Sequence, residues 1–186
     1  PGTSCSDRLA IAVTPVKRVS FDAVDLDVKK VEVDGKAVPF DQSSGEALHV
    51  LLPRVIKAHT EFTVRITYQA TPQRGLYFVG QEQAWTQGQD IDSRHYFPCL
   101  DTPAQKCSTE VTAHFPKKFT SLSNGELVSD KTKGARRTMH WKLEAPHAPY
   151  LVTLVVGNFE VLEQRHGEMK VRTLFPPGRK DDALRC

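Results

Sequence analysis

The sequence has no long apolar run and no large excess of either charge. Its longest apolar run, Tyr150 to Val156, is far shorter than the roughly 20 residues of a membrane-spanning helix, so we expect no membrane span. A net charge of +3 with 25% charged residues gives no sign of a disordered chain or of a tail that binds polyanions. Residues 1–14 lack the basic, apolar and small-residue order of a secretory signal, which favours a cytoplasmic location.

Cysteines and histidines are present, but not at the spacings that bind metals. We interpret the four cysteines, which include no C-x-x-C pair, as reduced thiols with buried or half-buried side chains: Cys5, Cys99, Cys107 and Cys186. A zinc site needs closely spaced ligands, so that a short loop can enclose the ion. None of the seven histidines begins an H-E-x-x-H helix. The sequence therefore predicts no metal site within these residues.

Basic residues gather in one stretch of the sequence: Lys131, Lys133, Arg136, Arg137 and Lys142. Such a cluster could bind phosphate groups, but no aromatic residues are interleaved with the charges and no known docking motif accompanies them. Acidic residues lie close by, between Glu126 and Glu144, as is typical of a solvated hairpin and the outward face of a strand. We therefore expect no nucleic-acid partner.

The strongest pattern in the sequence has a period of two. Apolar Phe62, Val64, Ile66 and Tyr68 alternate with polar residues, which places the apolar set on one face of a half-buried strand. Similar patterns occur at Val19 and Phe21, Val31 and Val33, Leu48 to Leu52, Val111 to Phe115, Met139 to Leu143, Tyr150 to Val156, and Met169 to Phe175. Turn residues such as Asp34-Gly35 and Asn124-Gly125 separate them. Many short strands without a long helical period predict an all-β fold, an antiparallel β-sandwich or open saddle.

At 186 residues the chain most simply forms a single domain, 1–186, and a domain of this size buries roughly 70% of the surface that its unfolded chain exposes. No linker, internal repeat or low-complexity stretch divides it. Only residues 181–186 show the start of a helix. Because the sequence begins with Pro1 rather than methionine, we expect its start to be trimmed.

The stretch Thr86-Gln87-Gly88-Gln89 carries more uncharged hydrogen-bonding capacity than the strands around it. On extended backbone, Gln87 and Gln89 leave from the same face, and Gly88 between them lets a backbone or a ligand come close. Amides can hold an ammonium or peptide group without the desolvation cost of a full charge. The alternative is that both amides satisfy local backbone groups in a turn. Spacing alone does not separate the two interpretations.

The residues that follow the glutamines predict a long, fixed loop. Arg94 lies near Asp90, Asp92 and Asp101 in the sequence, so ion pairs can attach the irregular segment to the core. The aromatic residues after Arg94, at positions 96 and 97, are expected to be buried. We assign Arg94 and Asp101 a structural role, which is to hold the glutamine pair in place.

Four stretches together are similar to one family. W-T-Q-G-Q-D-I-D-S-R-H-Y-F-P-C-L-D-T-P-A-Q-K at 85–106 resembles the signature of the N-terminal domain of zinc aminopeptidases of the aminopeptidase N type, the gluzincin family that includes leukotriene-epoxide hydrolase. R-G-L-Y-F at 74–78, F-T-S-L-S-N-G-E-L at 119–127 and P-Y-L-V-T-L-V-V-G-N-F-E at 149–160 look like the same domain in the same order. The resemblance covers most of the chain, from about Val19 onward.

The resemblance implies a β-saddle that packs on the protein's own C-terminal catalytic domain and lends residues to the peptide cleft. At the positions that match, the resemblance implies that Gln89 would bind the free α-amine at the N-terminus of the peptide substrate and that Gln87 would line the pocket for the first side chain. The parent enzyme would be a zinc metallo-aminopeptidase. Its zinc helix and its G-x-M-E-N strand do not occur in these residues, so we expect the catalytic domain after Cys186 and no activity from this chain alone.

One departure from the family pattern keeps the substrate class open. Many aminopeptidases of this type have glutamate where this sequence has Gln89, and the epoxide-hydrolase branch resembles this sequence in having glutamine. Peptidase activity and combined peptidase and epoxide-hydrolase activity are therefore both compatible with the sequence. Two non-enzymatic alternatives are a scaffold domain whose parent has lost its zinc ligands, and an independent β-sandwich that binds a ligand.

Overall fold

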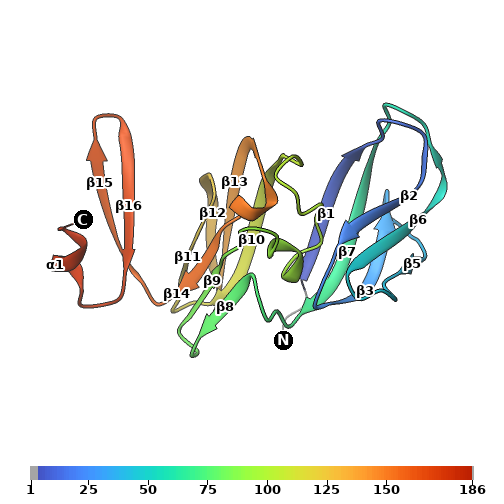
Figure 1. Cartoon of the computed structure of the whole chain (residues 1–186). Coiled ribbons are helices and arrows are strands. Elements are labelled where there is room, and N and C mark those ends of the chain that lie inside the picture. Colours follow the sequence, from blue (N-terminus) through green and yellow to red (C-terminus); the bar gives the residue numbers. More distant parts are fainter. Residues whose placement is uncertain (1–3, 186) are drawn as a thin grey trace. The chain divides into compact units, whose positions relative to one another are not determined.

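The computed structural model describes residues 4–185, with side chains from Ala10 onward. The chain forms two compact units, each with its own sheets (Figure 1). The first unit runs to Tyr77 and adds Thr86–Cys107 and Ala145–Val152. The second unit consists of Phe78–Trp85, Ser108–Glu144 and the chain from Thr153 onward. All pairings given by the sheet registers are antiparallel, so the prediction of an all-β antiparallel fold is confirmed. That the two units make up a single domain stays a prediction.

Two antiparallel sheets build the first unit. The larger sheet has the strand order β1 (Ser4–Ile11), β7 (Glu61–Ala70), β3 (Leu26–Val33) and β4 (Lys36–Ala37). The smaller sheet has the order β2 (Val16–Asp22), β6 (Ala47–Ile56) and β5 (Phe40–Asp41). At the predicted Asp34-Gly35 turn between β3 and β4, both residues have positive φ, which Asp tolerates and Gly favours.

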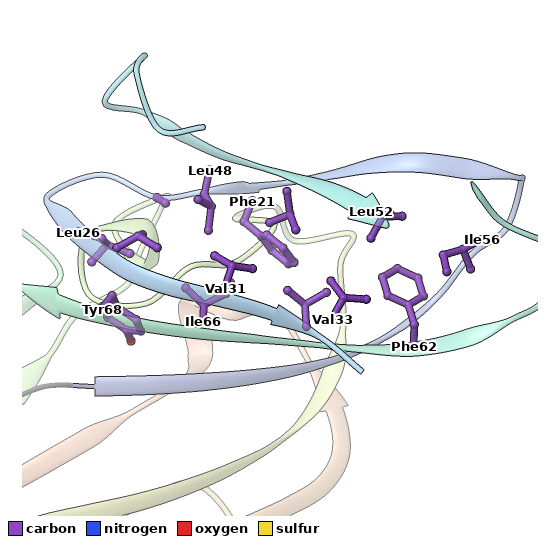
Figure 2. Packing of buried hydrophobic residues seen from close by; sticks show 14 of the residues in the cluster. Phe21, Leu26, Val31, Val33, Leu48, Leu52, Ile56, Phe62, Ile66 and Tyr68 are labelled. Atoms are coloured by element: carbon purple, nitrogen blue, oxygen red, sulfur yellow. The ribbon is translucent and has the colours of Figure 1, made fainter. Parts of the chain in front are cut away.

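The core of the first unit contains side chains from both sheets (Figure 2). In β7, the predicted set Phe62, Val64, Ile66 and Tyr68 is buried, while Glu61 and Arg65 are exposed. In Figure 2 the ring of Phe62 on β7 extends toward Leu52 and Ile56 of β6. Burial of a side chain of this size stabilises the fold by roughly 1.5–3 kcal/mol. The alternation is therefore enough to determine which face of the strand is buried in the core.

Three sheets build the second unit. One has the order β10 (Cys107–Pro116), β13 (Arg136–His147), β12 (Glu126–Lys133), and another the order β11 (Thr120–Ser123), β14 (Leu154–Gly157), β9 (Gln83–Thr86), β8 (Leu76–Val79). The third pairs β15 (Glu160–His166) with β16 (Met169–Phe175), and the short helix α1 (Lys180–Ala183) follows. A smaller core contains Ala113, Phe115, Met139 and Trp141, where Trp141 Nε1 donates to Ser121 Oγ at 3.1 Å.

Two sequence-based expectations are wrong in detail. The apolar run from Tyr150 to Val156 is not one strand: a 3₁₀ turn, η2 (Pro149–Leu151), precedes β14. Pro149 explains this, because its fixed φ and missing N–H suit the first position of a helical turn. Cys107 is exposed rather than buried, since it begins β10 at the margin of a sheet, whereas Cys99 is buried as expected. Cys5 and Cys186 lie outside the residues whose side chains are described.

Candidate functional site

The two glutamines lie on the loop between β9 and the 3₁₀ turn η1 (Ser93–His95). From Thr86 onward this segment belongs to the first unit. We call residues 87–92 the glutamine loop. Gln87 and Gln89 are exposed, whereas Gly88 between them is buried. Among the described residues, neither side-chain amide has a hydrogen-bond partner. The peptide bond from Gln89 to Asp90 is cis. The loop therefore offers both amides to a group outside the described part of the chain.

Gly88 is glycine because the backbone of Tyr150 lies against it. A Cβ at position 88 would lie 2.9 Å from Tyr150 Cα, 3.0 Å from Tyr150 O and 2.6 Å from Ser93 Oγ, all too close for a side chain. Nearby, the hydroxyl of Thr86 donates to Val152 O at 3.4 Å. The close approach that the sequence predicts at Gly88 is thus made by the 3₁₀ turn η2 of the same unit.

Arg74 and Gly75 contact both ends of the glutamine loop. At the start of the loop, Gln87 N donates to Gly75 O at 2.8 Å. At its end, Arg74 Nη2 lies 2.9 Å from Oδ1 of the buried Asp92, and Asp92 N donates back to Gly88 O at 2.9 Å. Gly75 has φ +79°, and a Cβ there would lie 2.1 Å from Asp92 O. Sequence reasoning missed this contact, although Arg74 and Gly75 begin one of the four stretches that carry the family resemblance.

Arg94 and Asp101 are in direct contact beside the loop. Arg94 donates to Asp101 Oδ2 from its backbone N at 3.1 Å and from Nε at 3.3 Å, and the Asp101 side chain is only 1% exposed. Asp22 joins them, because Asp101 N donates to Asp22 Oδ2 at 2.9 Å and Arg94 Nη1 lies 3.7 Å from Asp22 Oδ1. Asp92, which the sequence groups with Arg94, pairs with Arg74 instead. That Arg94 and Asp101 hold the glutamines in place stays a prediction.

The aromatic residues after Arg94 attach the segment to the first core. Phe97 packs against that core, and its ring meets the ring of Tyr96 edge-on at 4.8 Å. Tyr68 donates through its hydroxyl to Tyr96 O at 3.0 Å. Burial raises the pKa of the Tyr96 phenol, so this hydroxyl stays protonated and donates to Val152 O at 3.0 Å. Both rings are half-buried. Their contacts attach the segment that follows the glutamine loop to the first core.

The basic cluster of the sequence lies on the β12–β13 hairpin of the second unit. Arg137 is paired with Asp130, Nε to Oδ1 at 2.8 Å, and its guanidinium holds the pKa of that carboxyl below the ordinary value. Lys142 Nζ lies 3.1 Å from Glu110 Oε1 and 2.7 Å from Glu144 Oε1. Two of the five cations are therefore neutralised by partners on the same surface, as is typical of a solvated strand face.

Neither a membrane helix nor a metal cluster is found in the part of the chain that the structure describes. No helix within residues 4–185 has the length and hydropathy needed to cross a bilayer. In the same range, no group of three or more histidine, cysteine, aspartate or glutamate side chains is placed to hold a metal ion. Among these residues, no set of side chains therefore fits a catalytic zinc ion.

These features define an all-β chain that presents two polar side chains from one loop. The model of the Peptidase M1 N-terminal domain matches residues 3–151, and the chain belongs to this family. It is 30% identical to aminopeptidase RNPEPL1 of Homo sapiens over 128 residues, which are 62% of this chain and 17% of that protein. It is 28% identical to aminopeptidase B of Rattus norvegicus over 127 residues, 64% of this chain and 19% of that protein. The chain thus spans less than a fifth of these relatives.

A solved structure has the same fold. The M1 zinc metallopeptidase of Deinococcus radiodurans, as a mutant bound to a Tyr-Ser-Ala substrate, matches with a TM-score of 0.85. The match covers 95% of this chain and 44% of that chain, at 19% sequence identity. It therefore confirms the fold predicted from the family resemblance, and the family match confirms the resemblance itself.

Proposed function

We propose that this chain is the substrate-anchoring domain of a zinc aminopeptidase, in which Gln89 binds the free α-amine of a peptide and Gln87 lines the pocket for its first side chain. The observation that carries the proposal is the exposed pair of amides, which have no hydrogen-bond partners among the described residues. Amides that only satisfied local backbone groups would be bonded within the loop. The loop itself is held by Gly75, Asp92 and the backbone around Tyr150.

The chemistry of an amide suits this task. The carbonyl oxygen of Gln89 can accept a hydrogen bond from an ammonium group, and a hydrogen bond to a charged group contributes about 1.5–3 kcal/mol. An amine held at a fixed position places only the first peptide bond within reach of the catalytic groups. Such an anchor would explain how the enzyme removes single residues from the N-terminus. The loop must be rigid for this purpose, because an amide that moves out of place no longer holds the ammonium group.

Zinc belongs to this proposal as a group bound by another part of the parent enzyme. The relatives named above are aminopeptidases several times longer than the aligned region, and the structural neighbour is a zinc metallopeptidase. We place the zinc ligands in a catalytic domain that follows Cys186. When bound there, zinc would polarise the scissile carbonyl and activate water. The residues described here would supply positioning only.

Replacing Gln89 by glutamate tests the anchor. In the complete natural protein, Gln89→Glu should lower KM for free-amine peptides about tenfold, because a carboxylate forms a charge-assisted hydrogen bond with the ammonium that is roughly twice as strong. The measurement is the KM of an aminoacyl p-nitroanilide, compared with the inhibition constant of the matching N-acetylated compound. The N-acetylated compound has no ammonium, so its inhibition constant should not change.

Gln105→Glu is the matched control for the added charge. Gln105 is exposed and belongs to the same unit. Its backbone N–H donates to Thr102 O, whereas its side chain has no hydrogen-bond partner among the described residues. This variant should leave both constants unchanged. Equal shifts for the free-amine and the N-acetylated compound in Gln89→Glu would show that Gln89 has a structural role and would refute the anchor.

The 186-residue chain alone should not hydrolyse peptides. No cluster of side chains among the described residues fits a zinc ion. The proposed role of the chain is to position the α-amine of the peptide. The check is an assay of the purified chain with an aminoacyl p-nitroanilide, with and without added zinc. Hydrolysis that rises in proportion to bound zinc would contradict this expectation.

A further inference from the structure

The glutamine loop is held at both ends by two consecutive residues of another segment. Gly75 O accepts the N–H of Gln87 at the first position of the loop, and Arg74 Nη2 reaches Asp92 Oδ1 at the last. Asp92 in turn closes the loop on itself, since its N–H donates to Gly88 O. The residues between these contacts, including Gln89, have no hydrogen bonds of their own side chains to other described residues. The position of Gln89 therefore depends on the two ends.

The Arg74–Asp92 pair joins an exposed cation to a buried anion. The Asp92 side chain is 7% exposed, whereas the Arg74 side chain is 63% exposed. A carboxylate with so little access to water needs a partner, and Arg74 is the only cation that forms an ion pair with it among the described residues. The described part of the chain shows no other ion pair to Asp92, because Arg94 is turned toward Asp101 and Asp22. Loss of Arg74 would draw Asp92 toward water and release the end of the loop.

We propose that Arg74 is a positioning residue for amine recognition: through Asp92 it holds the loop that carries Gln89. This inference rests on the proposed function, because it gives Arg74 a role only if Gln89 binds the amine. Arg74 has no part in the chemical step and none in contacting the substrate. Loss of Arg74 should therefore raise KM for free-amine substrates and leave kcat nearly unchanged.

The test uses the complete natural protein and five variants, one of which combines Gln89→Ala with Arg74→Ala. Arg74→Ala should raise KM for a leucyl p-nitroanilide about tenfold, with little change in kcat, because the amide is no longer held in place. Arg74→Lys should recover most of the loss, since one charged contact to Asp92 suffices. Arg54→Ala, which removes an exposed arginine on β6 that has no hydrogen bond or ion pair of its side chain to other described residues, should leave KM at its original value. On a Gln89→Ala background, Arg74→Ala should raise KM no further.

The outcomes separate the two proposals. If Gln89→Ala leaves KM for the free-amine substrate unchanged, the proposed function fails, whatever Arg74→Ala does. If Gln89→Ala raises KM but Arg74→Ala does not, only the role of Arg74 fails. The same conclusion holds if Arg74→Ala lowers kcat alone, if Arg74→Lys gives no recovery, or if the effects of Arg74→Ala and Gln89→Ala on KM multiply. In each of these cases Arg74 would not act on KM through Gln89.

Discussion

Replacing Gly75 by alanine is expected to destabilise the 186-residue chain by about 3 kcal/mol or more. Gly75 has φ +79°, and this left-handed conformation alone costs a residue with a Cβ about 1–2 kcal/mol. The added Cβ would also lie 2.1 Å from Asp92 O and 2.9 Å from the Tyr96 ring. A backbone oxygen cannot move aside as a flexible side chain can, so the glutamine loop must shift. Urea denaturation measures the free energy of unfolding.

Gly35→Ala is the matched control for this substitution. Gly35 belongs to the same unit and has φ +76°, but nothing lies within 4 Å of a Cβ built there. It should cost only the conformational part, about 1–2 kcal/mol. The difference between the two variants isolates the close approach of the loop to Gly75. Equal losses in both would mean that the loop adapts to a side chain at position 75 without cost.

Replacing Asp101 by asparagine is expected to lower the free energy of unfolding by about 3 kcal/mol. The Asp101 side chain is 1% exposed and accepts two hydrogen bonds from Arg94 through one oxygen. Removal of its charge leaves a largely buried guanidinium with only Asp22, 3.7 Å away, as an anionic partner. Breaking one side of a buried ion pair is costly because the remaining charge is poorly solvated. Urea denaturation again gives the value.

Asp27→Asn provides the comparison for a surface ion pair. Asp27 pairs with Lys29 in the same unit, and both side chains are about half exposed or more. Surface pairs contribute about 0–1 kcal/mol, so this variant should stay close to the original stability. If Asp101→Asn behaves like Asp27→Asn, the Arg94–Asp101 contact does no more than an ordinary surface pair. In that case it cannot be what holds the segment after the glutamine loop.

The fold was predictable where the pattern is local and buried on one face. In β7 every second residue from Phe62 to Tyr68 is buried, as the alternation predicts, because a shift of one residue would expose the whole set. The turn at Asp34-Gly35 was predictable for a similar reason, since few residue pairs accept positive φ at both positions. The run from Tyr150 to Val156 was not, because seven mostly apolar residues do not show whether Pro149 begins a turn.

The contacts around the glutamine loop could not be derived from sequence spacing. Arg94 has three acidic residues near it in the sequence, Asp90, Asp92 and Asp101. The structure pairs it with Asp101 and with the distant Asp22, and pairs Asp92 with Arg74. Asp22 lies more than seventy positions from Arg94, on β2, and only the folded sheet brings it close. Charge patterns show that ion pairs are available, whereas the choice among partners depends on the backbone path.

The free amides of Gln87 and Gln89 have a consequence for how this domain can diversify. A residue whose side chain makes no hydrogen bond within the protein can be replaced at little cost in stability. Surface substitutions away from structural features usually alter stability by less than about 0.5 kcal/mol. The glycines beneath them, Gly75 and Gly88, tolerate no such change, since a side chain at either would strike backbone atoms. The domain thus separates residues that maintain the architecture from residues that face outward. If Gln87 and Gln89 bind the substrate as proposed, new ligand preferences can arise at these positions by single substitutions, without compensating mutations elsewhere.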